Sequence, residues 1–294
     1  MAENAEGPQA AAKVSTYMSG SLDPFADDMK DMVNNSNFSD LTFGVGKSRE
    51  VMYGHKVIIS PRCNVLLNSQ RSEESSTICL PDTSKQSFYA LLEFIYTNRV
   101  LLADATHAIE VLELSTKYKL AELHQLCVEY LLVNMNVTTA ADIMHAAVKQ
   151  SEKELKAAAL AYIEENTIKI FETSQFHLWT EETMCEVLKS DALDIDELVL
   201  IDKVGEWADM SILVIPGKTK VDFAGLAVRH IRLPLLTKEE LAAVDDENEK
   251  NRLFSIDIFR AAYRTMLEQK AGPYNPQTKP RKGTKERPHH KNFQ

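Results

Sequence analysis

The stretch from Asp40 to Tyr53 reads DLTFGVGKSREVMY and decides the fold of the first part of the chain. It holds two short runs of β-forming residues, Leu41–Val45 and Glu50–Tyr53, on either side of a Gly46-Lys47-Ser48 turn. Two such runs joined by a short loop that contains glycine are typical of a β-hairpin. The sequence therefore predicts a pair of antiparallel strands over residues 41–53.

Further short strands and one helix are predicted around this hairpin. Three more runs have β character: Val57–Ile59, Thr77–Leu80 and Arg99–Leu102. Before the last of them, apolar residues recur at the spacing of one helix face, namely Phe88, Leu91, Leu92, Ile95 and Tyr96. The first hundred residues are therefore expected to combine helices with a small sheet.

After Leu102 the apolar pattern has the period of helices alone. Ser151-x-x-Glu154 and Thr237-x-x-Glu240 have the form of a capping box, in which the hydroxyl and the carboxylate bind each other's free backbone N–H groups. Asp194-x-x-Glu197 is a looser version of the same signal. We expect about eight helices between residues 105 and 269, so the second half is predicted to be all-α.

Both ends of the chain lack a periodic apolar face. Residues 1–22 are small and polar and are predicted to be disordered. Residues 271–294 carry four prolines and two glycines and are predicted to be a basic linker or tail. From residue 279 onward six Lys and Arg residues stand against one Glu, a net charge of +5, which leaves -15 on the rest of a chain whose net charge is -10.

Composition narrows the class of protein. A chain of 294 residues with 44% hydrophobic and 26% charged residues is long enough for two domains. Because 43 acidic residues outnumber 33 basic ones, we expect no nucleic-acid partner. No apolar stretch approaches the ~20 residues that cross a bilayer, so no membrane partner is expected. Four scattered cysteines indicate buried free thiols in a soluble, reducing compartment, the cytoplasm or alternatively the nucleus.

No catalytic motif is complete in this sequence. Gly44-x-Gly46-Lys47-Ser48 resembles the end of a phosphate-binding loop, but Leu41 stands where that loop needs a glycine. Neither H-E-x-x-H nor G-x-S-x-G occurs. The acidic run Asp245–Glu249 is interpreted as a solvated loop, in preference to a metal site. We predict no enzymatic activity, no cofactor and no metal.

The order of several segments carries a family resemblance. These are DLTF at 40–43, GHK at 54–56, ICLPD at 78–82, FYALLEFIYTNRVLL at 88–102 and AIEVLELSTKYKLAELHQLCVEYLL at 108–132. Together they resemble a BTB/POZ domain, and the following helices resemble a BACK domain. The resemblance implies an α+β BTB/POZ domain over 23–133 and an all-α BACK domain over 134–270. The segment PYNPQTKPRKG is similar to the linker of the branch that carries a C-terminal PHR domain, which this sequence does not contain.

The resemblance implies a homodimer formed through the BTB domain, with residues 24–33 as a swapped N-terminal helix. An apolar face opposite a row of acids supports the helix itself, and its members are Phe25, Met29, Met32 and Val33. The alternative is that this helix packs on its own chain. Asp40 and Lys56 match the family's paired charges near the dimer groove, with a structural ion pair as the plainer interpretation.

The resemblance also implies a substrate adaptor for a cullin-3 RING ubiquitin ligase, in which other subunits supply catalysis and the protein substrate is unknown. The candidate cullin contacts are Leu66, Leu67, Glu73, Ile143 and Met144. A core position is the alternative for the four apolar residues. Many adaptors carry a hydrophobic-x-Glu element, and here Arg71 replaces its apolar anchor. The second hypothesis is therefore a dimeric BTB-BACK scaffold without a ligase.

Overall fold

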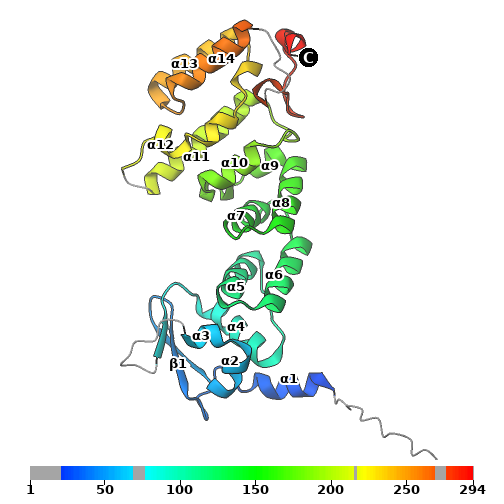
Figure 1. Ribbon diagram of the computed structural model, residues 1–294, viewed down its shortest axis with the longest axis vertical. Coiled ribbons are helices and arrows are strands. Elements are labelled where there is room, and N and C mark those ends of the chain that lie inside the picture. Colours follow the sequence, from blue (N-terminus) through cyan, green and yellow to red (C-terminus); the bar gives the residue numbers. More distant parts are fainter. Residues whose placement is uncertain (1–20, 69–76, 215–216, 269–275, 294) are drawn as a thin grey trace, which may run out of the picture. The chain divides into compact units, whose positions relative to one another are not determined.

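The structure, a computed structural model, describes residues 21–68, 77–214, 217–268 and 276–293 (Figure 1). The chain divides into two compact units. The first unit, the sheet unit, contains the residues up to Asp82 together with Leu92–Val100. The second, the helical unit, contains Thr83–Leu91 and the residues from Leu101 onward.

A three-stranded sheet forms the centre of the sheet unit. Its strands β1 (Leu41–Val45), β2 (Glu50–Gly54) and β3 (Thr77–Leu80) lie in the order β2-β1-β3. Strand β1 pairs antiparallel with β2 and parallel with β3. The predicted hairpin and the predicted strand at 77–80 are confirmed. Gly54 is required where β2 ends, because a Cβ there would lie 2.8 Å from the Phe43 ring and from Ile59.

The sheet unit also contains α1 (Leu22–Lys30), α2 (Lys56–Arg62) and α3 (Asn64–Asn68), while α4 (Lys85–Thr97) is divided between the two units. The predicted strand at 57–59 is wrong, since these residues belong to α2. The chain enters this helix because the Asp40 carboxylate accepts a hydrogen bond of 2.7 Å from the Lys56 N–H.

The predicted strand at 99–102 is also wrong, because the chain is irregular there. Asn98 takes a left-handed φ of 59° at the end of α4. The Thr97 hydroxyl donates to the Glu93 carbonyl and accepts a hydrogen bond of 3.0 Å from the Arg99 N–H. These bonds satisfy the end of the helix and leave no extended run to pair with the sheet.

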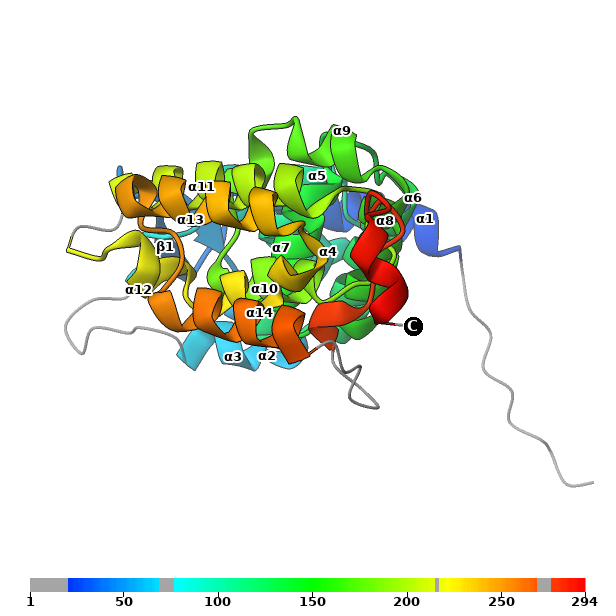
Figure 2. The same ribbon diagram turned by 90° about the horizontal axis from the view of Figure 1, so that it is seen from above.

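The helical unit is all-α, as predicted. Its first helices are α5 (Ala105–Tyr118), α6 (Ala121–Val133), α7 (Ala140–Lys149), α8 (Lys153–Glu165) and α9 (Thr167–Phe171). They are followed by α10 (Glu181–Leu188), α11 (Glu197–Val214), α12 (Lys220–Ala224), α13 (Lys238–Asn251) and α14 (Ile256–Glu268). Seen from above, α13 lies over α11 (Figure 2), and residues of both helices line one pocket.

The capping signals had different outcomes. Thr237 and Glu240 form the predicted capping box of α13. Ser151 does not cap α8, because its φ of 59° leaves it in a tight turn and the helix begins two residues later. Asp194 does not cap α11; Asp196 accepts from the Leu198 N–H instead. The acidic run 245–249 was expected to be a loop, and it lies inside α13, which the capping box starts and Arg252 ends.

The C-terminal segment was expected to be a linker or tail, but residues 276–293 pack on the helical unit; we call them the C-terminal clasp. Arg281 Nε donates to Glu197 Oε1 at 2.7 Å, and both side chains are 0% exposed. The second Glu197 oxygen accepts from the Arg232 N–H at 2.9 Å. Residues 271–275 and 294 lie outside the described residues. The interpretation as a linker or tail is therefore corrected for 276–293, where Arg281 forms a buried ion pair with the helical unit.

Two further contacts fix the clasp. Arg287 donates to Asp196 at the start of α11, at 3.0 Å, and to Glu240 in the first turn of α13, at 2.5 Å. The Gly283 N–H donates to the Leu193 carbonyl at 3.1 Å, and a Cβ on Gly283 would lie 1.9 Å from the Ile195 nitrogen. A glycine is therefore required at this point of the clasp.

The buried pair predicts the effect of removing one partner. Arg281→Ala leaves the Glu197 carboxylate buried without its cation, so the free energy of unfolding should fall by about 3–5 kcal/mol in urea titrations. Lys282→Ala is the matched control, because Lys282 and its partner Asp194 are 59% and 52% exposed, and it should cost less than about 1 kcal/mol. Equal, small losses in both variants would contradict the buried geometry.

The acids of the clasp predict a pH dependence. Burial raises the pKa of Asp196 and Glu240, but hydrogen bonds from Arg287 and from backbone N–H groups, together with the charge of Arg287, outweigh it and hold both below their ordinary 3.8 and 4.5. The folded state therefore binds fewer protons than the unfolded state, and the stabilisation is complete above pH 4.5 and lost as the pH falls further. The difference in unfolding free energy between the wild type and Arg287→Met should shrink below pH 4.5. A constant difference down to pH 3 would contradict this.

Candidate functional site

Helix α1 presents an exposed apolar edge. Leu22 is 77% and Phe25 60% exposed, whereas Ala26 and Val33 are buried in the sheet unit. Met29 and Met32 are half-buried. The predicted apolar face is thus divided: Val33 packs on its own chain, and Phe25 is left at the surface. Packing on its own chain thus describes Val33, and the dimer contact of Phe25 stays a prediction.

Ion pairs hold α1 against the end of α4 and the residues after it. Lys30 Nζ lies 2.7 Å from the Glu93 carboxylate, which is 8% exposed. Arg99 Nη1 lies 3.0 Å from Asp27, and the same guanidinium also pairs with Asp23. Cations from both sides of the contact take part, and these ion pairs favour the direction of α1 that leaves its apolar edge outward.

Asp40 and Lys56 are brought together, but through the backbone. The Asp40 carboxylate binds the Lys56 N–H at the start of α2, and no ion pair joins the two side chains in the described residues. Next to them, His55 Nε2 donates to the Asn37 carbonyl at 2.9 Å, so the Tyr96 hydroxyl donates to Nδ1 and accepts from the His55 N–H. Burial raises the pKa of Tyr96 to about 12, so its hydroxyl keeps its proton at neutral pH and serves as a structural hydrogen-bond partner of His55.

The structure describes four of the five candidate cullin contacts. Leu66 and Leu67 in α3, and Ile143 and Met144 in α7, are all buried. Their positions correspond to the core alternative, and the surface beside Leu66 is formed by the partly exposed Val65. Glu73 and Arg71 lie outside the described residues.

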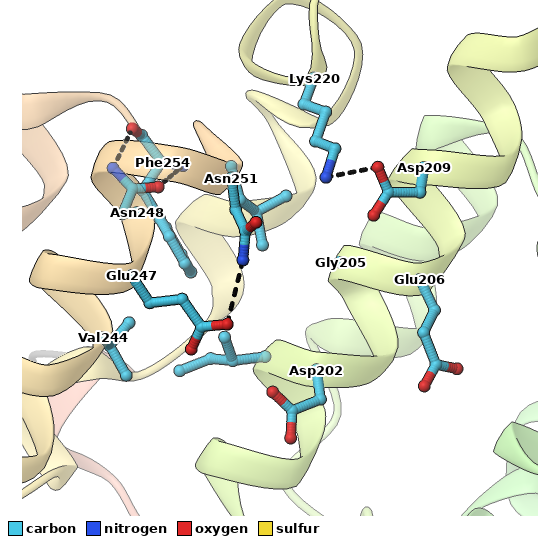
Figure 3. Close-up of a pocket in the computed structure, with 12 residues that line it drawn as sticks. Asp202, Gly205, Glu206, Asp209, Lys220, Val244, Glu247, Asn248, Asn251 and Phe254 are labelled. Atoms are coloured by element: carbon cyan, nitrogen blue, oxygen red, sulfur yellow. Dashed lines mark hydrogen bonds and ion pairs between the residues drawn. The ribbon is translucent and has the colours of Figure 1, made fainter.

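Sequence reasoning missed a pocket in the helical unit between α11, α12 and α13 (Figure 3). Its volume is about 260 Å³. Carboxylates of α11 and α13 line it, and the buried side chains Ile201, Leu253 and Phe254 also contribute. The available signal was the acidic run 245–249, which seemed a solvated loop because it contains no apolar residue.

The described residues contain neither a cluster of metal ligands nor a helix that could span a membrane. Among them, no group of three or more His, Cys, Asp and Glu side chains is placed to hold a metal ion. None of their helices has the length and hydropathy needed to cross a bilayer. All four cysteines are free thiols, three of them buried. Burial raises the pKa of Cys127 to about 12, which keeps this thiol protonated at neutral pH.

Two family models match the chain in succession. The BTB/POZ domain model matches residues 29–135, from the end of α1 to just after α6, and the model described as BTB And C-terminal Kelch matches residues 140–245, from α7 into α13.

Similar proteins carry corresponding names. BTB/POZ domain-containing protein 19 of Bos taurus is 28% identical over 92% of this chain and 94% of its own length. BTB/POZ domain-containing protein 9 of Drosophila melanogaster is 26% identical over 76% of this chain and 30% of its own length. BTB/POZ domain-containing protein 3 of Homo sapiens is 24% identical, over 76% of this chain and 45% of its own length. The two family models match in the order BTB then BACK, and the structure has an α+β unit followed by helices. The chain therefore belongs to the BTB/POZ-BACK domain proteins.

Proposed function

We propose that this protein is a protein-interaction adaptor that acts as a BTB homodimer and recruits a protein substrate to a cullin-3 RING ubiquitin ligase. The observation that carries the proposal is the anchored helix α1 with Leu22 and Phe25 exposed. Large apolar side chains grouped on a fixed helix are typical of a surface that another protein covers. A second copy of the chain, with the same helix, is the partner that the BTB/POZ architecture favours.

Energetics support a role for these side chains in dimerisation. Fully burying a Leu or Phe side chain contributes about 1.5–3 kcal/mol. A two-fold symmetric dimer contains each residue twice, so four side chains, Leu22 and Phe25 of both copies, would be buried. The ion pairs of Arg99 and Lys30 favour the same direction of α1 before association, which would lower the ordering cost of binding.

The ligase part of the proposal rests on the domain order, BTB followed by BACK, which is typical of adaptors and scaffolds. We propose the exposed neighbours of the apolar candidates, such as Val65, as the cullin contact. The candidates themselves are buried, namely Leu66, Leu67, Ile143 and Met144. The alternative function is a dimeric scaffold without a ligase, and Arg71 in place of an apolar anchor favours it. A cytoplasmic location and the absence of enzymatic activity stay predictions.

The dimer predicts a defined effect of charge on α1. Phe25→Glu would place a carboxylate in each half of an apolar interface, so the dimer dissociation constant should rise at least tenfold, because an unpaired buried charge is costly. Sedimentation equilibrium of the full chain measures this. Leu178→Glu is the matched control, since Leu178 is similarly exposed but lies in the helical unit. A monomeric wild type, or a dimer unaffected by Phe25→Glu, would rule out α1 as the interface.

Cullin binding is tested separately on the same purified chain. In pull-downs with the N-terminal part of cullin-3, the wild type should bind at micromolar concentration, and Glu73→Lys and Val65→Asp should each bind more weakly. Val51→Asp, which changes an exposed apolar residue in strand β2, is the control. A stable dimer that captures no cullin-3 at this concentration would leave the scaffold as the function.

A further inference from the structure

The pocket between α11 and α13 combines an apolar lining with acidic groups. Ile201, Leu253 and Phe254 contribute buried apolar side chains. Asp202 from α11 and Glu247 from α13 lie across the pocket from each other in Figure 3. The two helices therefore bring acids that are 45 positions apart in the sequence to one opening.

The cations around the pocket neutralise only part of its charge. Lys220 of α12 pairs with Asp209, and Lys203 lies 2.9 Å from Glu206. Glu247 accepts a hydrogen bond of 3.1 Å from Asn251, which is uncharged. For Asp202 no hydrogen bond or ion pair is found within the described residues. Asp202 and Glu247 are thus two exposed carboxylates at the pocket for which the described residues supply no paired cation.

The acids also repel one another. Burial raises the pKa of Asp202, and the neighbouring charges of Glu247 and Glu206 raise it further, while Lys203 acts in the opposite direction. A cation that enters the pocket would relieve this repulsion, whereas an anion would increase it. Charge complementarity therefore selects a positively charged occupant.

We propose that this pocket is a docking site for an arginine or lysine side chain of a basic peptide segment in a partner protein. The apolar lining receives the aliphatic stem, and Asp202 and Glu247 bind the charged head group. The volume of about 260 Å³ lies just below the range of small-molecule sites, which suits one side chain better than a whole ligand. The site lies within the helical unit, so it is independent of the proposed dimer and cullin contacts.

The two arginines of the chain's own C-terminal segment are already engaged elsewhere. Arg281 is held by Glu197, and Arg287 by Asp196 and Glu240. The contact of Arg287 with the starts of both α11 and α13 also fixes the spacing of the two helices that form the walls of the pocket. The clasp therefore prepares the site without filling it, and the occupant comes from another protein.

Fluorescence anisotropy with a labelled tetra-arginine peptide tests this proposal on the full chain at low salt. The same peptide with citrulline in place of arginine keeps the size and removes the charge, so it should not bind. The double variant Asp202→Asn/Glu247→Gln should weaken tetra-arginine binding by about fivefold or more, as expected for the loss of two exposed ion pairs. Methyl NMR signals of Ile201, Val244 and Leu253 should shift on addition of the arginine peptide to the wild type.

A matched control separates the site from the overall acidity of the protein. Asp245→Asn/Glu249→Gln removes the same charge from the α13 sequence without changing a residue that lines the pocket, and it should leave the affinity within twofold. Equal weakening in the two double variants would overturn the proposal, as would binding of the citrulline peptide with equal affinity. Absence of arginine binding at millimolar peptide, or binding without shifts of the three methyl groups, would overturn it as well.

Discussion

The buried pair of Glu197 and Arg281 is the interaction on which the helical unit depends. A charge moved out of water is costly, and here the cost is offset because every partner is in place. Glu197 accepts from both the Arg281 guanidinium and the Arg232 N–H, and Arg281 also donates to the carbonyls of Ser190 and His230. The pair connects the first turn of α11 to a segment 84 residues further along the chain. The C-terminal clasp is therefore part of the folded unit.

The same contacts connect the clasp to the pocket that is proposed to bind a partner. Arg287 joins the start of α11 to the start of α13, and the acidic pocket lies further along these two helices. In the sheet unit, Arg99 and Lys30 have a comparable role, because they hold α1 with its apolar edge exposed. In both units a few basic side chains orient a helix, and the helix then presents the surface that is proposed to meet another protein.

The sequence predicted those features that depend on local patterns. Strands β1, β2 and β3, the apolar stripe of α4 and the cap of α13 each follow from residues close together in the chain. The errors arose where a distant group decides the local structure. Val57–Ile59 is helical because Asp40 binds the first N–H of α2, and the clasp looked like a linker because its partners are remote in sequence. Composition alone describes a segment such as 276–293 poorly when its two arginines form buried ion pairs with distant acids.

Hydrogen–deuterium exchange on the full chain tests the central claim, that the clasp and α11 form one cooperative structure. The Lys282 N–H donates to the Asp191 carbonyl at 2.9 Å and the Gly283 N–H to the Leu193 carbonyl at 3.1 Å, so both amides report on the clasp directly. We expect these two amides to exchange as slowly as the amides in the first turns of α11, through the same opening event. Exchange of these two amides at the rate of an unstructured peptide, with α11 still protected, would contradict it.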